Sequence, residues 1–189
     1  MPIERYGARE LEALRNAGRV AAQTLSTVGA QLRPGMTTAD IDQLVREDTA
    51  RRGARPSQLG DHGFPATVCT RRKQVVCHGV PSARDRLAEG DIINVDITSE
   101  LRGFHGDTSA TFAIGRVSAE ARHVMDVARR CLWAGIAQVR PGARLGDIGA
   151  AIAELAASAG CSVVREYGGH CIGRHMHMEP HVAHFGVRG

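Results

Sequence analysis

The sequence predicts an α+β fold built from two related α/β halves. Two pairs of segments show the three-to-four-residue apolar spacing of amphipathic helices, and a stretch rich in β-branched residues separates the pairs. The turn of the first pair, Arg-Pro-Gly at residues 33–35, recurs in the second pair at residues 140–142. Gly53 recurs in the same register at Gly160. Several landmarks in one register favour a duplication over a chance similarity between amphipathic helices.

Each half is expected to contain two helices. Thr37, followed three residues later by Asp40, resembles a capping box at the start of the second helix. A glycine follows the second helix of each half, where helices commonly end. The expected helices cover residues 10–32, 37–53, 118–139 and 145–159.

Strands are expected between the two helix pairs, where β-branched residues are bounded by turn formers. The expected strands cover residues 67–69, 75–77, 91–98, 108–114 and, after the last helix, 162–165. A glycine- and histidine-rich tail follows. The first half runs through its strands to residue 114, so the repeat predicts a matching strand set that ends at about residue 222. The sequence ends at Gly189, so we expect residues 1–189 to form a single domain whose second half is incomplete.

Composition argues against several classes of protein. The net charge is +4 and the pI about 9.1, but the basic residues are scattered, which makes nucleic acid an improbable main ligand. The five cysteines are odd in number and contain no Cys-x-x-Cys pair, which is typical of a reducing cytosol. Neither a signal peptide nor an apolar run of the roughly 20 residues that a membrane span needs is visible. We therefore expect a cytoplasmic protein without a membrane partner.

Two acids stand out within the strand region. Asp96 interrupts an apolar run at residues 92–97, and an acid is costly to bury there unless it is paired or metal-bound. Asp107 follows after a plausible hairpin turn at residues 101–103. Two antiparallel strands could place both carboxylates side by side, where a divalent cation would relieve their repulsion. The alternative is a pair of ordinary acids, at a strand end or hydrogen-bonded to backbone. The strand context of the pair favours metal.

Several histidines also lie in distinctive contexts. His78 follows the apolar run at residues 75–77, and His170 follows two glycines. His175 and His177 could share one face of a strand, but without further ligands they are a weak metal signal. A lone histidine is more often structural or solvated than catalytic, so these residues alone leave their roles open.

The acids and histidines fall within a set of motifs that resembles a known family. The set comprises Val-Val-Cys-His-Gly at 75–79, Asn-Val-Asp at 94–96, Gly-Phe-His-Gly-Asp-Thr at 103–108, Arg-Glu-Tyr-Gly-Gly-His at 165–170 and Gly-Arg-x-x-His at 173–177. No single motif is specific, but the set is. In order and spacing it resembles the bacterial type I methionine aminopeptidases, from the first helix to about Pro180.

The resemblance implies a fold, an activity and a cofactor. The family has the pita-bread fold of creatinase and aminopeptidases, in which two α/β halves clasp two metal ions. Its members are metal-dependent hydrolases that remove the initiator methionine from the N-termini of nascent polypeptides, so the ribosome is a possible partner. The carboxylate and imidazole ligands suit cobalt, manganese, iron or zinc alike.

The resemblance also assigns residues. Asp96 would bind one metal ion, Asp107 would bridge both, and His170 would bind the second. His78 and His177 would be catalytic residues that contact the substrate, near the new N-terminus and the scissile carbonyl respectively. The pocket for the methionine side chain would be lined by Phe64, Cys69 and Met176.

One departure leaves an alternative open. The family uses two further glutamate ligands, and the resemblance implies that their positions lie beyond Gly189. An inactive pita-bread binding module, or a fragment that lacks two metal ligands, is therefore the alternative to an active peptidase. A different hydrolase on the same fold, such as a proline-specific peptidase, is a weaker alternative.

Overall fold

The structure, a computed structural model, describes residues 3–189. The chain divides into two compact units. The first unit comprises Glu4–Val117 together with Ile172–Met176, and the second comprises Ser118–Cys171 and His177–Gly189. The expectation that both belong to one catalytic domain stays a prediction. None of the helices among the described residues is long and apolar enough to cross a lipid bilayer.

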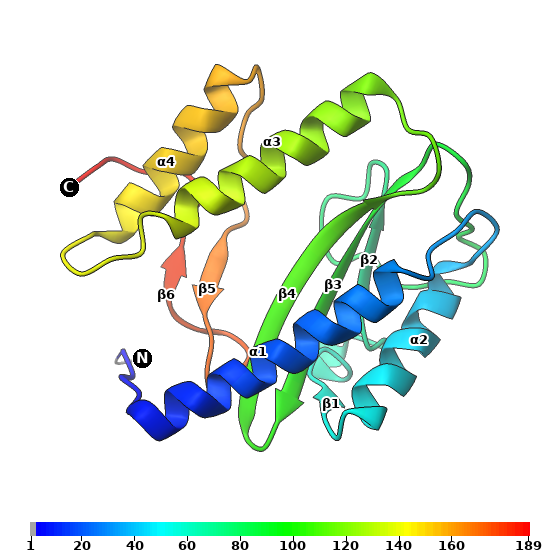
Figure 1. The fold of residues 1–189 in the computed structure, drawn as a ribbon, viewed down its shortest axis with the longest axis horizontal. Helices are drawn as coiled ribbons and strands as arrows, with labels where there is room; N and C mark the ends of the chain where they lie inside the picture. Colours follow the sequence, from blue (N-terminus) through cyan, green and yellow to red (C-terminus); the bar gives the residue numbers. More distant parts are fainter. Residues whose placement is uncertain (1–2) are drawn as a thin grey trace. The chain divides into compact units, whose positions relative to one another are not determined.

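The first unit is a sheet with two helices. Its central strand, β3, pairs antiparallel with each of β1, β2 and β4. Figure 1 shows α1 lying across β3 and β4. The elements are α1 (Ala8–Gly29), α2 (Thr38–Arg51), β1 (Arg55–Pro56), a short 3-10 turn (Asp61–Gly63), β2 (Cys69–Arg72), β3 (Ile92–Leu101) and β4 (Phe104–Ala113).

The strands β3 and β4 form a tight hairpin. Leu101 pairs with Phe104, which leaves Arg102 and Gly103 as a two-residue loop. Both loop residues have positive φ, 53° and 84°, as a type I′ turn requires. Glycine adopts this backbone without strain, and the turn sets the register of the whole hairpin. The turn predicted at residues 101–103 is therefore confirmed.

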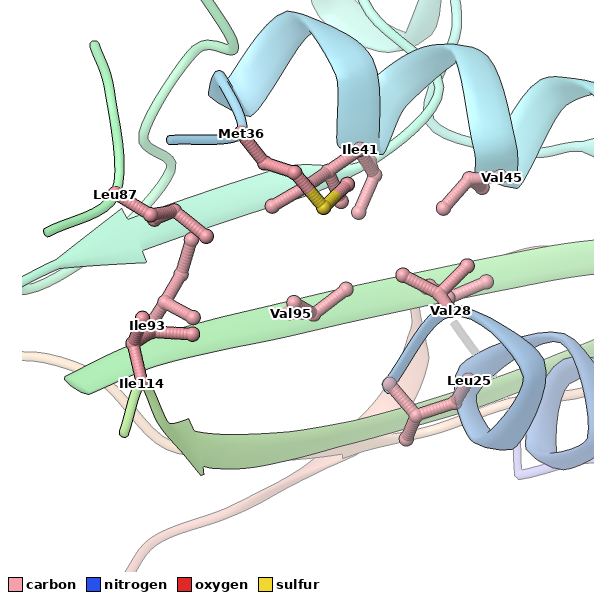
Figure 2. Packing of buried hydrophobic residues seen from close by; sticks show 11 residues of the cluster. Leu25, Val28, Met36, Ile41, Val45, Leu87, Ile93, Val95 and Ile114 are labelled. Atoms are coloured by element: carbon pink, nitrogen blue, oxygen red, sulfur yellow. The ribbon is translucent and has the colours of Figure 1, made fainter. Parts of the chain in front are cut away.

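The core of the first unit lies between the sheet and the two helices. Successive side chains of a strand point to opposite faces, and the odd-numbered residues Ile93, Val95 and Ile97 of β3 are fully buried. They meet Val28 of α1 and Ile41 of α2 in one cluster (Figure 2). Burial of each such side chain stabilises the fold by about 1.5–3 kcal/mol, so this face of β3 fixes the position of the strand.

The second unit is a helix pair with a short strand pair. Its elements are α3 (Ala119–Ile136), α4 (Leu145–Ser158), β5 (Gly169–Cys171) and β6 (Met178–Val182). The helices pack through Val127, Cys131 and Ala156. The strands β5 and β6 pair antiparallel with an irregularity after His170.

The internal repeat is visible in the backbone. The helices α2 and α4 begin and end at residues that differ by the offset of the repeat, Thr38–Arg51 and Leu145–Ser158. Glycines at equivalent positions share a left-handed backbone, with φ of 90° at Gly35 and 85° at Gly142. Equivalent acids cap the two helices, because Asp40 and Asp147 accept hydrogen bonds from the backbone N–H three residues earlier. The predicted duplication is confirmed for this helix–turn–helix portion.

Three strand predictions were wrong. Residues 75–77 form a loop, in which Val76 is 63% exposed and so has no apolar surface to pack against. Residues 162–165 are irregular, and the predicted tail instead carries β5 and β6. The strand expected at 67–69 begins at Cys69 and extends to Arg72, because its pairing with β3 overrides the polar character of this segment.

The contact between α1 and β4 predicts opposite effects for two glycines. A β-carbon at Gly106 of β4 would lie 2.5 Å from the carbonyl oxygen of Ala17 and closer still to the amide nitrogen of Gly18. Gly106→Ala should therefore lower the free energy of unfolding by about 3 kcal/mol, as overpacking against backbone does. Urea unfolding followed by circular dichroism measures the change.

Gly18→Ala is the matched control. A β-carbon at Gly18 would meet nothing within 4 Å, and alanine favours a helix interior by roughly 1 kcal/mol over glycine. This variant should be as stable as the parent chain or slightly more stable. Equal effects of the two substitutions would contradict the close packing of α1 on β4.

Candidate functional site

The face of the sheet opposite the core is polar. The even-numbered residues of β3 point to this face, because the odd-numbered ones are in the core. The strand register adds residues of β2 and β4 to the same face. We call this set the polar face; it comprises Cys69, Arg71, Asn94, Asp96, Thr98, Asp107, Ser109 and Thr111.

The two acids predicted as metal ligands share the polar face. Asp96 lies opposite Ser109, and Asp107 lies opposite Thr98, so the two acids are diagonal neighbours and not a directly facing pair. Diagonal residues have α-carbons roughly 7–8 Å apart, within reach of two carboxylate side chains. Asp107 is exposed, whereas the side chain of Asp96 is 19% exposed.

The carboxylate of Asp96 is engaged by a cation of the chain itself. The Nη2 of Arg71 donates to Oδ2 of Asp96 in an ion pair whose side chains are 18% and 19% exposed. The Nη1 of the same guanidinium donates to Oδ1 of Asn94 at 2.8 Å. Asn94 in turn donates through Nδ2 to Oγ1 of Thr111 at 3.2 Å. A hydrogen-bonded chain therefore crosses three strands of the polar face.

This arrangement decides whether the residues fit a divalent cation. Two carboxylates on one face are a suitable donor set, since carboxylate oxygens bind manganese, iron, cobalt and zinc. The Oδ2 of Asp96, however, already accepts from the Arg71 guanidinium. A metal ion at this oxygen would stand beside a fixed positive charge, so Oδ2 of Asp96 fits a metal ion only after the Arg71 guanidinium has withdrawn.

Cys69, predicted to line the substrate pocket, is buried on the polar face. Gln58 donates through Nε2 to its sulfur at 3.7 Å and to the backbone oxygen of Asp96 at 3.0 Å. Burial, together with the negative charge of Asp96, raises the pKa of the Cys69 thiol to about 12. The thiol stays protonated at neutral pH, which suits an apolar wall and not a nucleophile or a metal ligand.

The other two predicted pocket residues also belong to the first unit. Phe64 follows the short 3-10 turn and is half-buried, and Met176 is buried. Met176 ends the segment Ile172–Met176, which belongs to the first unit. The His105 amide donates to the Gly173 carbonyl at 2.8 Å, and Arg174 forms an ion pair with Glu10 at 2.9 Å.

His78, predicted to contact the substrate, is exposed in the loop after β2. Its φ of 49° lies in the left-handed region, which is uncommon for a residue other than glycine. The loop is tied back to β2, because the Thr70 amide donates to the Gly79 carbonyl at 2.9 Å. The strand expected at residues 75–77, just before His78, is therefore replaced by an anchored turn.

His170 and His177 belong to the second unit, where their ring centroids are 4.5 Å apart. The Nδ1 of His170 lies 3.0 Å from the Cys171 carbonyl. A carbonyl only accepts, so Nδ1 is the donor in this contact. Within residues 3–189 no three His, Cys, Asp or Glu side chains form a group that could hold a metal ion. Convergence of His170 with the two acids stays a prediction.

Sequence reasoning missed Arg71 and Gln58 as partners of Asp96. The strand expected at residues 67–69 ends at Cys69, which leaves Arg71 outside it. With the strand extended to Arg72, the alternation of side chains places Arg71 on the same face as Cys69. Gln58 lies in the loop between β1 and the 3-10 turn and carries no local signal.

The basic run at residues 71–73 is neutralised by acids. Arg72 pairs with Asp85 at 2.7 Å and with Asp91 at 3.0 Å, and the Nζ of Lys73 lies 2.9 Å from Asp91. With Arg71 paired to Asp96, the run presents no unpaired basic cluster to a nucleic acid.

Comparison with known proteins identifies the family. The metallopeptidase family M24 matches residues 12–188. Methionine aminopeptidase B of Synechocystis sp. is 43% identical over 187 residues, which cover 96% of this chain and 68% of the relative. Methionine aminopeptidase of Salmonella typhimurium is 41% identical over 186 residues, which cover 98% and 70%. The chain therefore belongs to metallopeptidase family M24. Within that family its relatives are methionine aminopeptidases, as the motifs predicted.

Solved structures confirm the fold. Methionine aminopeptidase from Rickettsia prowazekii aligns with a TM-score of 0.97 and 38% identity over 100% of this chain and 75% of that chain. The enzyme from Thermotoga maritima aligns with a TM-score of 0.97 and 31% identity over 100% and 76%. A prolidase from Pyrococcus furiosus, at 15% identity and a TM-score of 0.81, shares the fold alone. The predicted α+β pita-bread fold is confirmed.

Asp91, the buried acid that pairs with Arg72 and Lys73, gives a prediction of how stability depends on pH. Burial by itself would raise the pKa of Asp91, but hydrogen bonds from Lys73, the Ala88 amide and Arg72 outweigh it, and the pKa lies below its ordinary value of 3.8. Asp91→Asn should lower the free energy of unfolding at pH 7 by about 2–4 kcal/mol. Urea unfolding at several pH values measures it.

The sign of the pH dependence follows from the lowered pKa. The contribution of Asp91 is fully present above the unfolded pKa of about 4 and is lost as the pH falls through the folded value. The difference in stability between the parent and Asp91→Asn should therefore shrink below about pH 4. Asp126→Asn is the control, since Asp126 is exposed and 3.8 Å from Arg130, and should change stability little. A difference that is constant with pH would contradict the assignment.

Proposed function

We propose that this protein is a methionine aminopeptidase that removes the initiator methionine from nascent polypeptides. The observation that carries the proposal is the relationship to methionine aminopeptidases, at 43% identity over 96% of the chain in one of them. Membership of metallopeptidase family M24 implies a divalent metal cofactor and hydrolysis as the reaction class. Two ions, of cobalt, manganese, iron or zinc, stay a prediction of the resemblance.

The positions of the site residues support the proposal. Asp96 and Asp107 share the polar face, as a metal-binding carboxylate pair requires. Cys69 and Met176 are buried and apolar, which suits recognition of a methionine side chain. The Nδ1 of His170 contacts the Cys171 carbonyl, an arrangement that orients a histidine to bind metal through Nε2. His78 and His177, both exposed, would contact the peptide near its scissile bond. A cytoplasmic location and contact with the ribosome stay predictions of the resemblance.

A specific observation favours a second function, that of an inactive binding module on the same fold. The Asp96 carboxylate is neutralised by Arg71, so the fold does not need a metal ion to offset this charge. Calorimetry with divalent ions distinguishes the two functions, because tight binding of two ions would exclude a module that has lost its metal site. Absence of both metal binding and turnover would favour the module.

The peptidase proposal predicts release of methionine from the tripeptide Met-Ala-Ser in the presence of manganese or cobalt. Free methionine is measured by chromatography over time. Asp96→Asn and Asp107→Asn should each lower kcat/KM by roughly a hundredfold, equivalent to about 2.7 kcal/mol, because each removes one of two carboxylates from the polar face.

Asp126→Asn, the same substitution on the surface of α3, should leave turnover unchanged. A peptide with a bulkier first residue, Trp-Ala-Ser, should release no amino acid, because the expected pocket is small. No turnover of Met-Ala-Ser with any of the four metals would reduce the relationship to one of ancestry and fold.

A further inference from the structure

The placement of Arg71 makes it a built-in competitor for the predicted metal position. Arg71 lies opposite Asn94, and Cys69 lies opposite Asp96, so Arg71 is the diagonal neighbour of Asp96 across β2 and β3. Its guanidinium reaches along the strand to the Oδ2 atom of Asp96. One of the two carboxylate oxygens of Asp96 is thereby occupied by a side chain of the same sheet.

The guanidinium is tethered in this position. Its Nη1 donates to Asn94, and Asn94 is itself fixed by its hydrogen bond to Thr111. Both members of the ion pair are about four-fifths buried, so water screens their attraction less than in a surface pair. The two hydrogen bonds orient the planar guanidinium along β3, which makes the pair a defined contact and not a loose surface encounter.

The tether is nevertheless incomplete. The Nε of Arg71 is buried and has no hydrogen-bond partner among residues 3–189. A buried donor without an acceptor costs about 1–3 kcal/mol, so part of the stability gained from Asp96 and Asn94 is offset. The guanidinium is therefore held by two contacts, and the unpaired Nε reduces the net stability that they give.

A divalent ion and the guanidinium exclude each other at this carboxylate. Both are cations, and their mutual repulsion at a separation of a few ångströms is of the same order as the attraction of either for Asp96. Occupation by metal therefore requires Arg71 to withdraw. The two predicted metal ligands Asp96 and Asp107 supply two negative charges, and Arg71 already cancels that of Asp96.

We propose that Arg71 acts as an internal counter-cation that competes with a divalent metal ion for Asp96 and so sets a weak metal affinity for this chain. The inference rests on the proposed function, since it concerns the metal position of that same site. In this proposal Arg71 is a positioning residue. It controls how much of the site is occupied by metal, and it does not touch the substrate.

Isothermal titration of the full chain with manganese chloride at pH 7.5, after removal of metals with a chelator, tests the proposal. Arg71→Gln, which keeps much of the length and removes the charge, should bind manganese at least about tenfold more tightly than the parent, equivalent to about 1.4 kcal/mol. Arg71→Lys keeps the charge and should stay within about threefold of the parent. Equal or weaker binding by Arg71→Gln would overturn the proposal.

Two further variants keep the test decisive. Arg55→Gln removes one positive charge from the same sheet, but Arg55 pairs with Glu100 and is 83% exposed, so its affinity for manganese should equal that of the parent. Asn94→Ala removes only the tether and should tighten binding by about threefold, because the guanidinium is then freer to leave. If Arg71→Gln fails to fold, an unchanged affinity in Asn94→Ala overturns the proposal by itself.

Thermal unfolding gives a second readout. In chelator, Arg71→Gln should melt below the parent, because the carboxylate of Asp96 has lost its partner. Manganese should raise the melting temperature of Arg71→Gln more than that of the parent, since a ligand of the folded state stabilises it in proportion to its affinity. An equal manganese-induced rise in both proteins would contradict the competition.

The outcome is independent of peptidase activity. Methionine release by the parent, with no gain of manganese affinity in Arg71→Gln, would overturn the competition and leave the proposed function standing. A gain of affinity in Arg71→Gln, with no methionine release by either protein, would support the competition and count against the proposed function.

Discussion

The two-residue period of β3 is the constraint on which the first unit depends. Ile93, Val95 and Ile97 are drawn into the core by the helices, and this leaves the intervening residues on the opposite face. A slip of one residue in the pairing would bury Asp96 and expose three aliphatic side chains, at a cost of the same order as the whole stability of a typical domain. The type I′ turn at Arg102 and Gly103 prevents the slip on the β4 side. Packing of the core therefore fixes the chemistry of the polar face.

Charge on the polar face is balanced within the chain. Asp96 carries the only negative charge of β3 in the middle of this face, and Arg71 of the neighbouring strand β2 forms an ion pair with it. Breaking such a partly buried pair leaves an uncompensated charge, so each partner holds the other in place. The metallopeptidase fold of this chain therefore holds a carboxylate pair suited to a divalent ion, but binding of an ion at Asp96 depends on the position of the Arg71 guanidinium.

The duplicated helix–turn–helix shows how little sequence is needed to reproduce a local structure. Gly35 and Gly142 share a left-handed backbone, and Asp40 and Asp147 cap equivalent helices, although most surrounding side chains differ. Turns and caps are satisfied by hydrogen bonds within a few residues, so they survive divergence of the surface they support. The strands have no such local rule, because their pairing joins residues that are distant in sequence.

The sequence by itself determined the helices, the hairpin turn and the presence of two acids on one strand pair, because each depends on spacing and turn chemistry within a few residues. It also determined the family, through motifs in a fixed order. Only the tertiary structure decided the partners of those acids. Arg71 lies 25 residues before Asp96 and Gln58 lies 38 residues before it, and both meet it through strand pairing and loop packing. Residues 75–77 form a loop and not the expected strand, and the side chains of Val75 and Val76 are exposed there. Contacts between residues distant in sequence depend on how the sheet assembles, which no local pattern encodes.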